Sequence, residues 1–285
     1  MPKVGVHIPE NRRPSILIDA EGLIKEHLIP ALNMHDIESF FPVMGWLCGK
    51  LSDGYIPLIF GFDALPSVTA DNLKAFSAAF GTTGTAPLFH MANVTPEARG
   101  NNVVESFILS CQNRRVIATK EDLRYAYKTL NGDKDDRDEV HLVALGNPHL
   151  SISELKQLSE LVSSDDRPKN SNVEVIACIG RHVYSDGEKL NYIQKLESFG
   201  VKFINDTCWC MLLDPPIIPS NNKAQIVTNS AKYATYGPGL TNRQLRFTST
   251  HGCIEASKTG RIARHCTIPQ YLRSFSVLAI RHFPK

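Results

Sequence analysis

Amides, hydroxyls, imidazoles, a lysine and two thiols follow five predicted strands in the second half of the chain. The segments that carry them are 146–151, 181–182, 205–208, 228–233 and 249–253. In an open parallel sheet, ligands bind beyond the carboxyl ends of the strands, so these side chains would gather along one edge. Thiolates and imidazoles bind metals, whereas amides and ammonium groups hold carboxylates. The sequence therefore predicts a polar site at that edge.

Several of these residues also have a purely structural explanation. Asn147-Pro148 is an ordinary turn pair, and Ser151 serves as a helix cap whatever else it does. Cys208 and Cys253 are 45 residues apart and belong to no CxxC pair, a spacing that by itself is weak evidence for a metal site. Gly252, just before a helical stretch, would place Cys253 at a helix N-terminus, which favours the thiolate that binds iron.

The strands that would carry this edge alternate with helices from residue 139 onward. Residues 139–145, 172–180 and 201–204 are short apolar runs typical of buried strands. Ser151 and Glu154 form a capping-box pattern before a helix, and residues 188–199 predict a second helix that ends at Gly200. This alternation is typical of βαβ units, and we expect a parallel sheet with helices on both faces.

The first half shows the same alternation more faintly. Residues 56–60 and 86–92 read as strands, and Thr69 could cap a helix that runs to Ala79. The charged stretch 131–138 has no apolar anchor and predicts a linker or surface loop. We therefore expect an α/β protein with parallel sheets flanked by helices in two lobes, residues 1–132 and 139–260, followed by a tail over 261–285.

The composition excludes several classes of protein. Lys and Arg total 31 against 29 Asp and Glu, and a net charge of +2 gives no electrostatic reason to expect nucleic acid or an anionic membrane as a partner. No apolar window suits a membrane span, and the first fifteen residues carry charges and prolines in place of a signal peptide. Seven cysteines are an odd number, so free thiols or metal ligands are expected in a cytoplasmic protein.

Six separate motifs resemble, in order, the catalytic large portion of aconitase X. They are ENRRPSILI (10–18), FPVMGWLCGK (41–50), GNPHLS (146–151), DTC (206–208), NSAKY (229–233) and GCIEA (252–256). The resemblance runs from about residue 5 to 260, implies aconitase-like parallel sheets, and leaves residues 261–285 as a divergent tail. Several motifs in the same order are far more specific than any one of them.

The resemblance implies an iron-dependent hydro-lyase that removes water from a small hydroxy acid such as cis-3-hydroxy-L-proline or, in archaeal relatives, mevalonate 5-phosphate. Cys208 and Cys253 match the family's ligands to iron or to an iron–sulfur cluster. Motifs around the substrate and the catalytic groups contain Asn147, His149, Ser151, Ser230 and Lys232. Loss of water needs a Lewis acid on the departing hydroxyl, a base, and donors that hold the substrate carboxylate.

The resemblance also defines two alternatives. Two parts of the family have no counterpart in this sequence: an N-terminal segment with a further cysteine ligand, and a small swivelling part with a serine base. We therefore expect a swivelling subunit or domain as a partner. A non-catalytic remnant that binds a partner is the first alternative. A zinc site made by Cys208, Cys210, Cys253 and His251 is the second.

Overall fold

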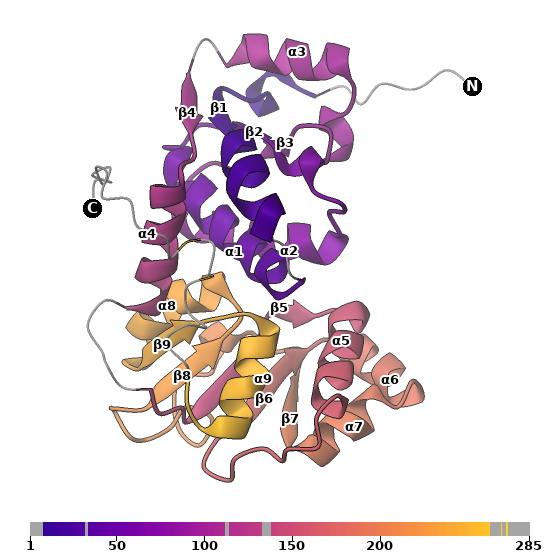
Figure 1. The fold of residues 1–285 in the computed structure, drawn as a ribbon, viewed down its shortest axis with the longest axis vertical. Coiled ribbons are helices and arrows are strands. Elements are labelled where there is room, and N and C mark those ends of the chain that lie inside the picture. The colour runs from indigo at the N-terminus through magenta and orange to yellow at the C-terminus, as the bar shows by residue number, and fades with distance from the viewer. Residues whose placement is uncertain are drawn as a thin grey trace.

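The computed structural model describes residues 8–31, 34–111, 114–132, 138–262, 269 and 272. Within these residues, strands and helices alternate and form two separate parallel sheets, one in the upper and one in the lower half of Figure 1. The expected α/β class with two lobes is therefore confirmed. Residues 133–137 of the expected linker lie outside the described residues.

The first lobe holds a four-stranded parallel sheet with the order β3-β2-β1-β4. Its strands are β1 (Ile16–Asp19), β2 (Pro57–Phe60), β3 (His90–Met91) and β4 (Arg115–Ile117), and its helices are α1 (Met34–Leu51), α2 (Ala70–Thr83), α3 (Asn101–Ser110) and α4 (Lys120–Asn131). The strand expected near 56–60 and the Thr69 cap are confirmed. The strand expected over 86–92 is wrong except for His90 and Met91, which form β3 at the edge of the sheet. Pro87, in the part that does not pair, has no backbone N–H to donate.

Two glycines let α1 and α2 pack closely. A Cβ atom on Gly45 would lie 2.2 Å from the carbonyl oxygen of Phe76, and one on Gly49 would lie 2.7 Å from that of Phe80. Any larger residue would push the helices apart. The sequence 41–50 therefore fixes the position of α2, which reaches the second lobe.

The second lobe holds a five-stranded parallel sheet with the order β7-β6-β5-β8-β9. Its strands are β5 (Leu142–Leu150), β6 (Glu174–Ile179), β7 (Val201–Asn205), β8 (Gln225–Thr228) and β9 (Gln244–Phe247), and its helices are α5 (Ile152–Ser163), α6 (Arg181–Lys189), α7 (Tyr192–Phe199), α8 (Ala231–Thr241) and α9 (Thr250–Thr259). Single helical turns or short irregular helices add η1 (Glu10–Arg12), η2 (Leu23–Leu28), η3 (Ile29–Ala31), η4 (Phe62–Ala64), η5 (Pro96–Ala98) and η6 (Trp209–Met211).

The capping box at the start of α5 is confirmed, with Ser151 and Glu154 as its two side chains. The single helix expected over 188–199 is instead split, because Asn191 takes a left-handed backbone conformation between α6 and α7. Gly200 ends α7 in the same conformation, as expected.

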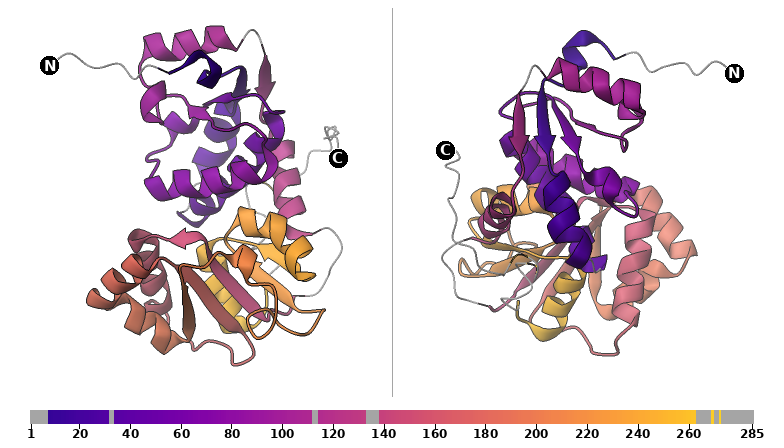
Figure 2. Two further views of the ribbon diagram at one scale, coloured as in Figure 1. Left: turned by 180° about the vertical axis from the view of Figure 1, so that it is seen from behind. Right: turned by 45° about the horizontal axis from the view of Figure 1, so that its top comes forward.

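The two faces of the second sheet have different cores. Leu142, Ala144 and Cys178 pack with Trp209 and with Tyr233 of α8 on one face. On the other face, Val143, Leu145 and Ala177 pack with Cys253 and Ile254 of α9. Helix α9 accordingly lies in front of this sheet in Figure 1 and behind it in the left view of Figure 2.

The two lobes share part of one core. Ala231 and Ala234 of α8 and Phe247 of β9 belong to the large apolar cluster of the first lobe, and the rings of Tyr127 and Phe247 lie 6.0 Å apart. Of the tail, Arg261 pairs with Glu139 in an antiparallel bridge, and Leu272 is buried in the first-lobe cluster. No helix among the described residues is long and apolar enough to cross a bilayer.

Candidate functional site

Strand β5 becomes irregular at the motif 146–149, where its pairing register with β6 shifts between Leu145 and Leu150. Gly146 has a φ of +81°, and a Cβ atom there would lie 2.1 Å from the carbonyl oxygen of Cys178. Only glycine fits this conformation and this close approach. The irregular segment turns the backbone of Asn147 and His149 away from normal strand pairing.

A pocket opens beside this segment, at the point where the strand order reverses between β5 and β8. It holds about 350 Å³ of empty space and is lined by Pro42, Lys74, Ala75, Gly146, Asn147, Pro148, Leu150, Glu154, Asn229, Ser230 and Ala231. Such a crevice is the usual ligand position in an open parallel sheet. Residues of α1 and α2 form its far wall, so both lobes contribute to it.

Asn147 and Ser230 meet directly in this pocket. The Ser230 hydroxyl donates to the Asn147 carbonyl oxygen and accepts the backbone N–H of Tyr233 at 3.0 Å, which caps α8. Asn147 is only 5% exposed, yet its side-chain nitrogen has no hydrogen-bond partner in the part of the chain that the structure describes. A buried donor without a partner is costly, and a ligand that accepts its hydrogen would remove that cost.

Lys74 of α2 connects the first lobe to the same segment. Its Nζ donates to the His149 carbonyl oxygen at 3.1 Å, lies 3.3 Å from Asp71, and contacts the carboxylate of Glu154. Burial raises the pKa of Glu154, and the Lys74 ammonium acts against that rise. These contacts hold the start of α5, including Ser151, against the first lobe.

His149 is half-buried at the end of β5. Its Nε2 lies 3.0 Å from the carbonyl oxygen of Thr207. A carbonyl only accepts, so Nε2 is the donor in this contact. The contact ties His149 to the loop that carries Cys208.

Cys208 and Cys210 lie near Asn147 and Lys232. Cys208 begins η6, and its sulfur accepts the backbone N–H of Cys210 at 3.5 Å. Burial and the neighbouring Cys208 raise the pKa of the Cys210 thiol, whereas Lys232 and Asn147 act in the opposite direction. The fully buried Tyr233 also faces these sulfurs, and its hydroxyl has no hydrogen-bond partner among the described residues.

Cys253 lies elsewhere. It is fully buried in the core on the other face of the sheet, and burial together with the nearby Glu38 raises the pKa of its thiol. The geometry thus brings together Asn147, His149, Ser230, Lys232 and Cys208, with Ser151 next to them, while Cys253 packs in the core between the sheet and α9.

The described residues do not fit a complete metal centre. Over the ranges from 8 to 262 that the structure describes, no three His, Cys, Asp or Glu side chains lie close enough to hold one ion. The alternative zinc site of Cys208, Cys210, Cys253 and His251 falls under the same finding, because these four described residues do not form such a cluster.

Three polar residues of this region were not among the residues expected from the sequence. Lys74 and Glu154 line the pocket, and Glu38 reaches it indirectly through Thr250 and Asn229. Lys74 and Glu154 are 80 residues apart along the chain, and no local pattern connects them. The sequence did single out Glu154, but as part of the capping box that begins α5 and not as a residue of the site.

Comparison with known proteins accounts for most of the chain. Residues 14–128 match the aconitase X second domain, and residues 140–259 match the aconitase X third domain. The chain is 38% identical over 260 residues to the cis-3-hydroxy-L-proline dehydratase of Pseudomonas aeruginosa, covering 91% of this chain and 42% of that protein. It is 30% identical to the phosphomevalonate dehydratase large subunit of Methanocaldococcus jannaschii, covering 91% of this chain and 58% of that protein.

A solved structure supports the same fold. The crystal structure of Thermococcus kodakaraensis aconitase X in its holo-form superposes with a TM-score of 0.65 at 21% identity, over 90% of this chain and 58% of that one. The chain thus spans about two fifths to three fifths of the length of these relatives. With two consecutive domain models matched in order, the chain belongs to the aconitase X family.

Proposed function

We propose that the chain is part of a hydro-lyase that removes water from a small hydroxy acid such as cis-3-hydroxy-L-proline. The pocket at the reversal of strand order supports this proposal most directly, since it holds the unpartnered amide donor of Asn147. The relatives named above as dehydratases supply the type of reaction.

In this proposal, Ser230 and Lys232 bind the substrate, and Asn147, His149 and Ser151 form the catalytic part of the site. Negative charge builds on the substrate carboxylate as its neighbouring proton leaves, and hydrogen bonds to charged groups are stronger than neutral ones. The Asn147 amide and the Lys232 ammonium are donors of the required kind. His149 is oriented by Thr207, which leaves its other ring nitrogen for proton transfer.

Iron, as an ion or a cluster, belongs to the same proposal, with Cys208 and Cys253 as thiolate ligands. Cys208 follows β7 and Cys253 follows β9 of the same sheet, and two thiolates leave further ligands to be supplied by another segment or chain. A swivelling subunit or domain is the proposed partner, in keeping with the name "large subunit" of the archaeal relatives. We also propose lobes 1–132 and 139–260 as separate domains and a cytoplasmic location.

The proposal is tested by measuring binding and dehydration of cis-3-hydroxy-L-proline with the chain purified anaerobically in the presence of iron. The assay is run with the chain alone and with the remaining domains of the Pseudomonas aeruginosa relative added as a separate protein. We expect binding in both cases, little turnover by the chain alone, and faster turnover after the addition. Absence of binding would contradict the proposal, and binding without turnover in both cases would favour the non-catalytic alternative.

A further inference from the structure

A chain of three side chains leads from the pocket to a carboxylate of the first lobe. Asn229 lines the pocket, and its Nδ2 donates to the hydroxyl of Thr250 at 2.8 Å. The Thr250 hydroxyl in turn contacts Oε1 of Glu38, which also accepts the Thr250 backbone N–H at 3.2 Å. Glu38 comes from α1 and Thr250 is the first residue of α9, so the chain of contacts crosses between the lobes.

The chemistry of these groups allows only one direction for the hydrogen bonds. Oε1 of Glu38 already accepts the Thr250 backbone N–H, so it also serves as the acceptor for the Thr250 hydroxyl, which must donate to it. That hydroxyl has a single hydrogen, and its oxygen can therefore only accept from Asn229. Its partner in Asn229 must be the amide nitrogen, which fixes the orientation of an amide group that is otherwise ambiguous.

This orientation determines what Asn229 offers to a ligand. The Asn229 nitrogen donates to Thr250 and also faces the Glu38 carboxyl group, so the group left over is the carbonyl oxygen. The structure gives that oxygen no hydrogen bond within its described residues. Asn147, which lines the same pocket, offers the opposite group, a buried N–H without a partner. The pocket thus presents one donor and one acceptor.

We propose that Glu38 and Thr250 are positioning residues that hold the Asn229 carbonyl oxygen as an acceptor in the pocket, and that this acceptor selects acids with an N–H donor next to the carboxylate. The selection rests on the proposed function, whereas the orientation of Asn229 does not. The ligand class is an α-amino or cyclic imino acid, whose carboxylate would meet Asn147 and whose ammonium would meet Asn229.

The first experiment tests the orientation without any ligand. The full 285-residue chain is labelled with ¹⁵N-asparagine, and the Asn229 side-chain amide pair is assigned by its loss in Asn229→Asp. In Thr250→Val, which keeps the shape of threonine but has no hydroxyl, the Asn229 pair should shift and exchange its hydrogens faster. Thr250→Ser restores the hydroxyl and should keep the native resonances. Unchanged Asn229 resonances in Thr250→Val would overturn the positioning role.

The second experiment tests the selection with two matched probes. L-Proline and tetrahydrofuran-2-carboxylate share a ring and a carboxylate, but the second has an ether oxygen in place of the ammonium. Calorimetry should show that the chain prefers L-proline about 10-fold, as expected for one hydrogen bond to a charged group. Thr250→Val should reduce this preference toward 1, and Thr250→Ser should retain it.

The outcomes separate the two proposals. Equal binding of both probes by the native chain, or a preference that survives in Thr250→Val, would overturn the selection while the proposed function stands. If neither probe nor cis-3-hydroxy-L-proline binds, the proposed function and the selection both fail, and the amide resonances still decide whether Glu38 and Thr250 orient Asn229.

Discussion

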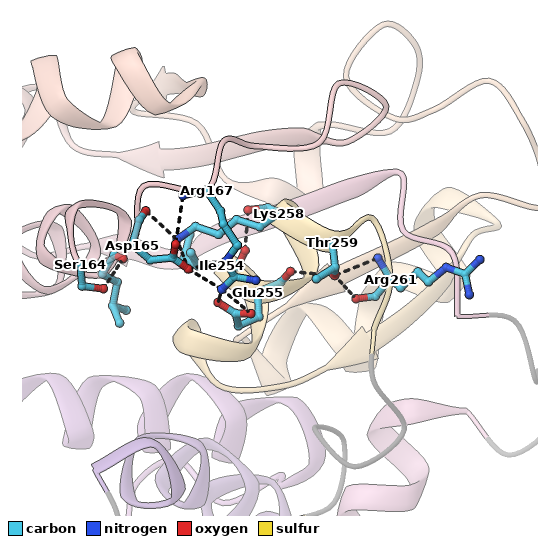
Figure 3. Close-up of polar contacts among 10 residues, drawn as sticks. Ser164, Asp165, Arg167, Ile254, Glu255, Lys258, Thr259 and Arg261 are labelled. Carbon is cyan, nitrogen blue, oxygen red and sulfur yellow. Dashed lines mark hydrogen bonds and ion pairs between the residues drawn. The ribbon is translucent and has the colours of Figure 1, made fainter.

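The two ends of helix α9 carry polar side chains with very different surroundings. Near its C-terminal end, Glu255 and Lys258 contact Asp165 and Arg167 in the loop after α5 (Figure 3). Arg167 donates to both oxygens of Glu255 at 2.8 and 3.1 Å, and Lys258 donates to the Asp165 carbonyl oxygen at 3.3 Å. We call these four residues the loop clamp.

At the N-terminal end of α9, Thr250 connects Glu38 to Asn229 and hence to the pocket. Asn147 lines the same pocket as Asn229, and its amide nitrogen has no hydrogen-bond partner among the described residues. Each charge of the loop clamp, by contrast, has a partner within the chain.

The difference separates groups that stabilise the fold from groups that serve a ligand. Buried polar groups are almost always hydrogen-bonded, so an unpartnered one needs a specific explanation. In the loop clamp the partners are internal, and a loss there should appear as reduced stability. At the pocket the partner is missing, and a loss there should appear as reduced binding.

The largest expected effect is on stability, in the loop clamp. The Lys258 side chain is only 2% exposed, and its ammonium lies 5.7 Å from the centre of the Phe199 ring. Lys258→Ala should lower the free energy of unfolding by about 2–4 kcal/mol, because it leaves a cavity where the aliphatic stem packs. Urea denaturation measures this loss.

Two variants control that experiment. Lys258→Met keeps the stem and should cost less than Lys258→Ala, and Lys189→Ala removes a lysine that is 71% exposed and should change stability by less than about 0.5 kcal/mol. If Lys258→Ala proves as mild as Lys189→Ala, the loop clamp does not stabilise the fold.

The second effect concerns binding at the pocket side. Lys232→Ala should raise the dissociation constant for cis-3-hydroxy-L-proline roughly 10- to 150-fold, because a charged hydrogen bond contributes about 1.5–3 kcal/mol. Unfolding by urea should be almost unchanged, because the half-buried Lys232 supports little core packing. Calorimetric titration measures the loss, with the exposed Lys195→Ala of α7 as the control. If Lys232→Ala binds with full affinity, Lys232 is an ordinary surface lysine and does not bind the substrate.

The contrast also explains which features could be predicted from the sequence. The second sheet was predictable because its strands are continuous apolar runs and because Ser151 and Glu154 mark the start of α5 by local chemistry. The placement of Asn147 and Ser230 at one edge followed from parallel-sheet topology. Features that are set by local sequence patterns could therefore be predicted.

Contacts between segments far apart in the sequence could not be predicted from such patterns. Glu38 and Thr250 are 212 residues apart, and nothing in either local sequence points to the other. The way in which the segments after β7 and β9 fold over the sheet likewise depends on distant packing, of Trp209 on one face and of Ile254 on the other.

The third prediction is that the two ends of α9 respond to pH with opposite signs. Burial raises the pKa of Glu38 above its ordinary 4.5, so its contribution to stability is fully present below pH 4.5 and is lost as pH rises through the folded-state value. Hydrogen bonds from Arg167 hold the pKa of Asp165 well below its ordinary 3.8, so its contribution is present above that pH and is lost on acidification.

Unfolding curves of the native chain, Glu38→Gln and Asp165→Asn at several pH values check these signs. The stability of the native chain relative to Glu38→Gln should fall with rising pH, with a slope of at most about 1.4 kcal/mol per pH unit for one proton. Relative to Asp165→Asn it should fall as the pH drops. His251 and Cys253 also lie near Glu38, so the native chain and both variants are compared in the same buffers over the same pH range. A common sign for both variants would contradict the assignment.

The smallest expected effect distinguishes a helix cap from a site residue. Ser151 caps α5 by accepting the Glu154 N–H at 3.1 Å, and Thr69 caps α2 by accepting the Asn72 N–H at the same distance. Both belong to complete capping boxes, so Ser151→Ala and Thr69→Ala should each cost about 1 kcal/mol of unfolding free energy. Only Ser151 belongs to the proposed catalytic part of the site, and only Ser151→Ala should also weaken binding of cis-3-hydroxy-L-proline. Should the two alanine variants bind equally well, Ser151 acts as a cap alone, because its hydroxyl already accepts the Glu154 N–H and lies 2.9 Å from the hydroxyl of Ser153.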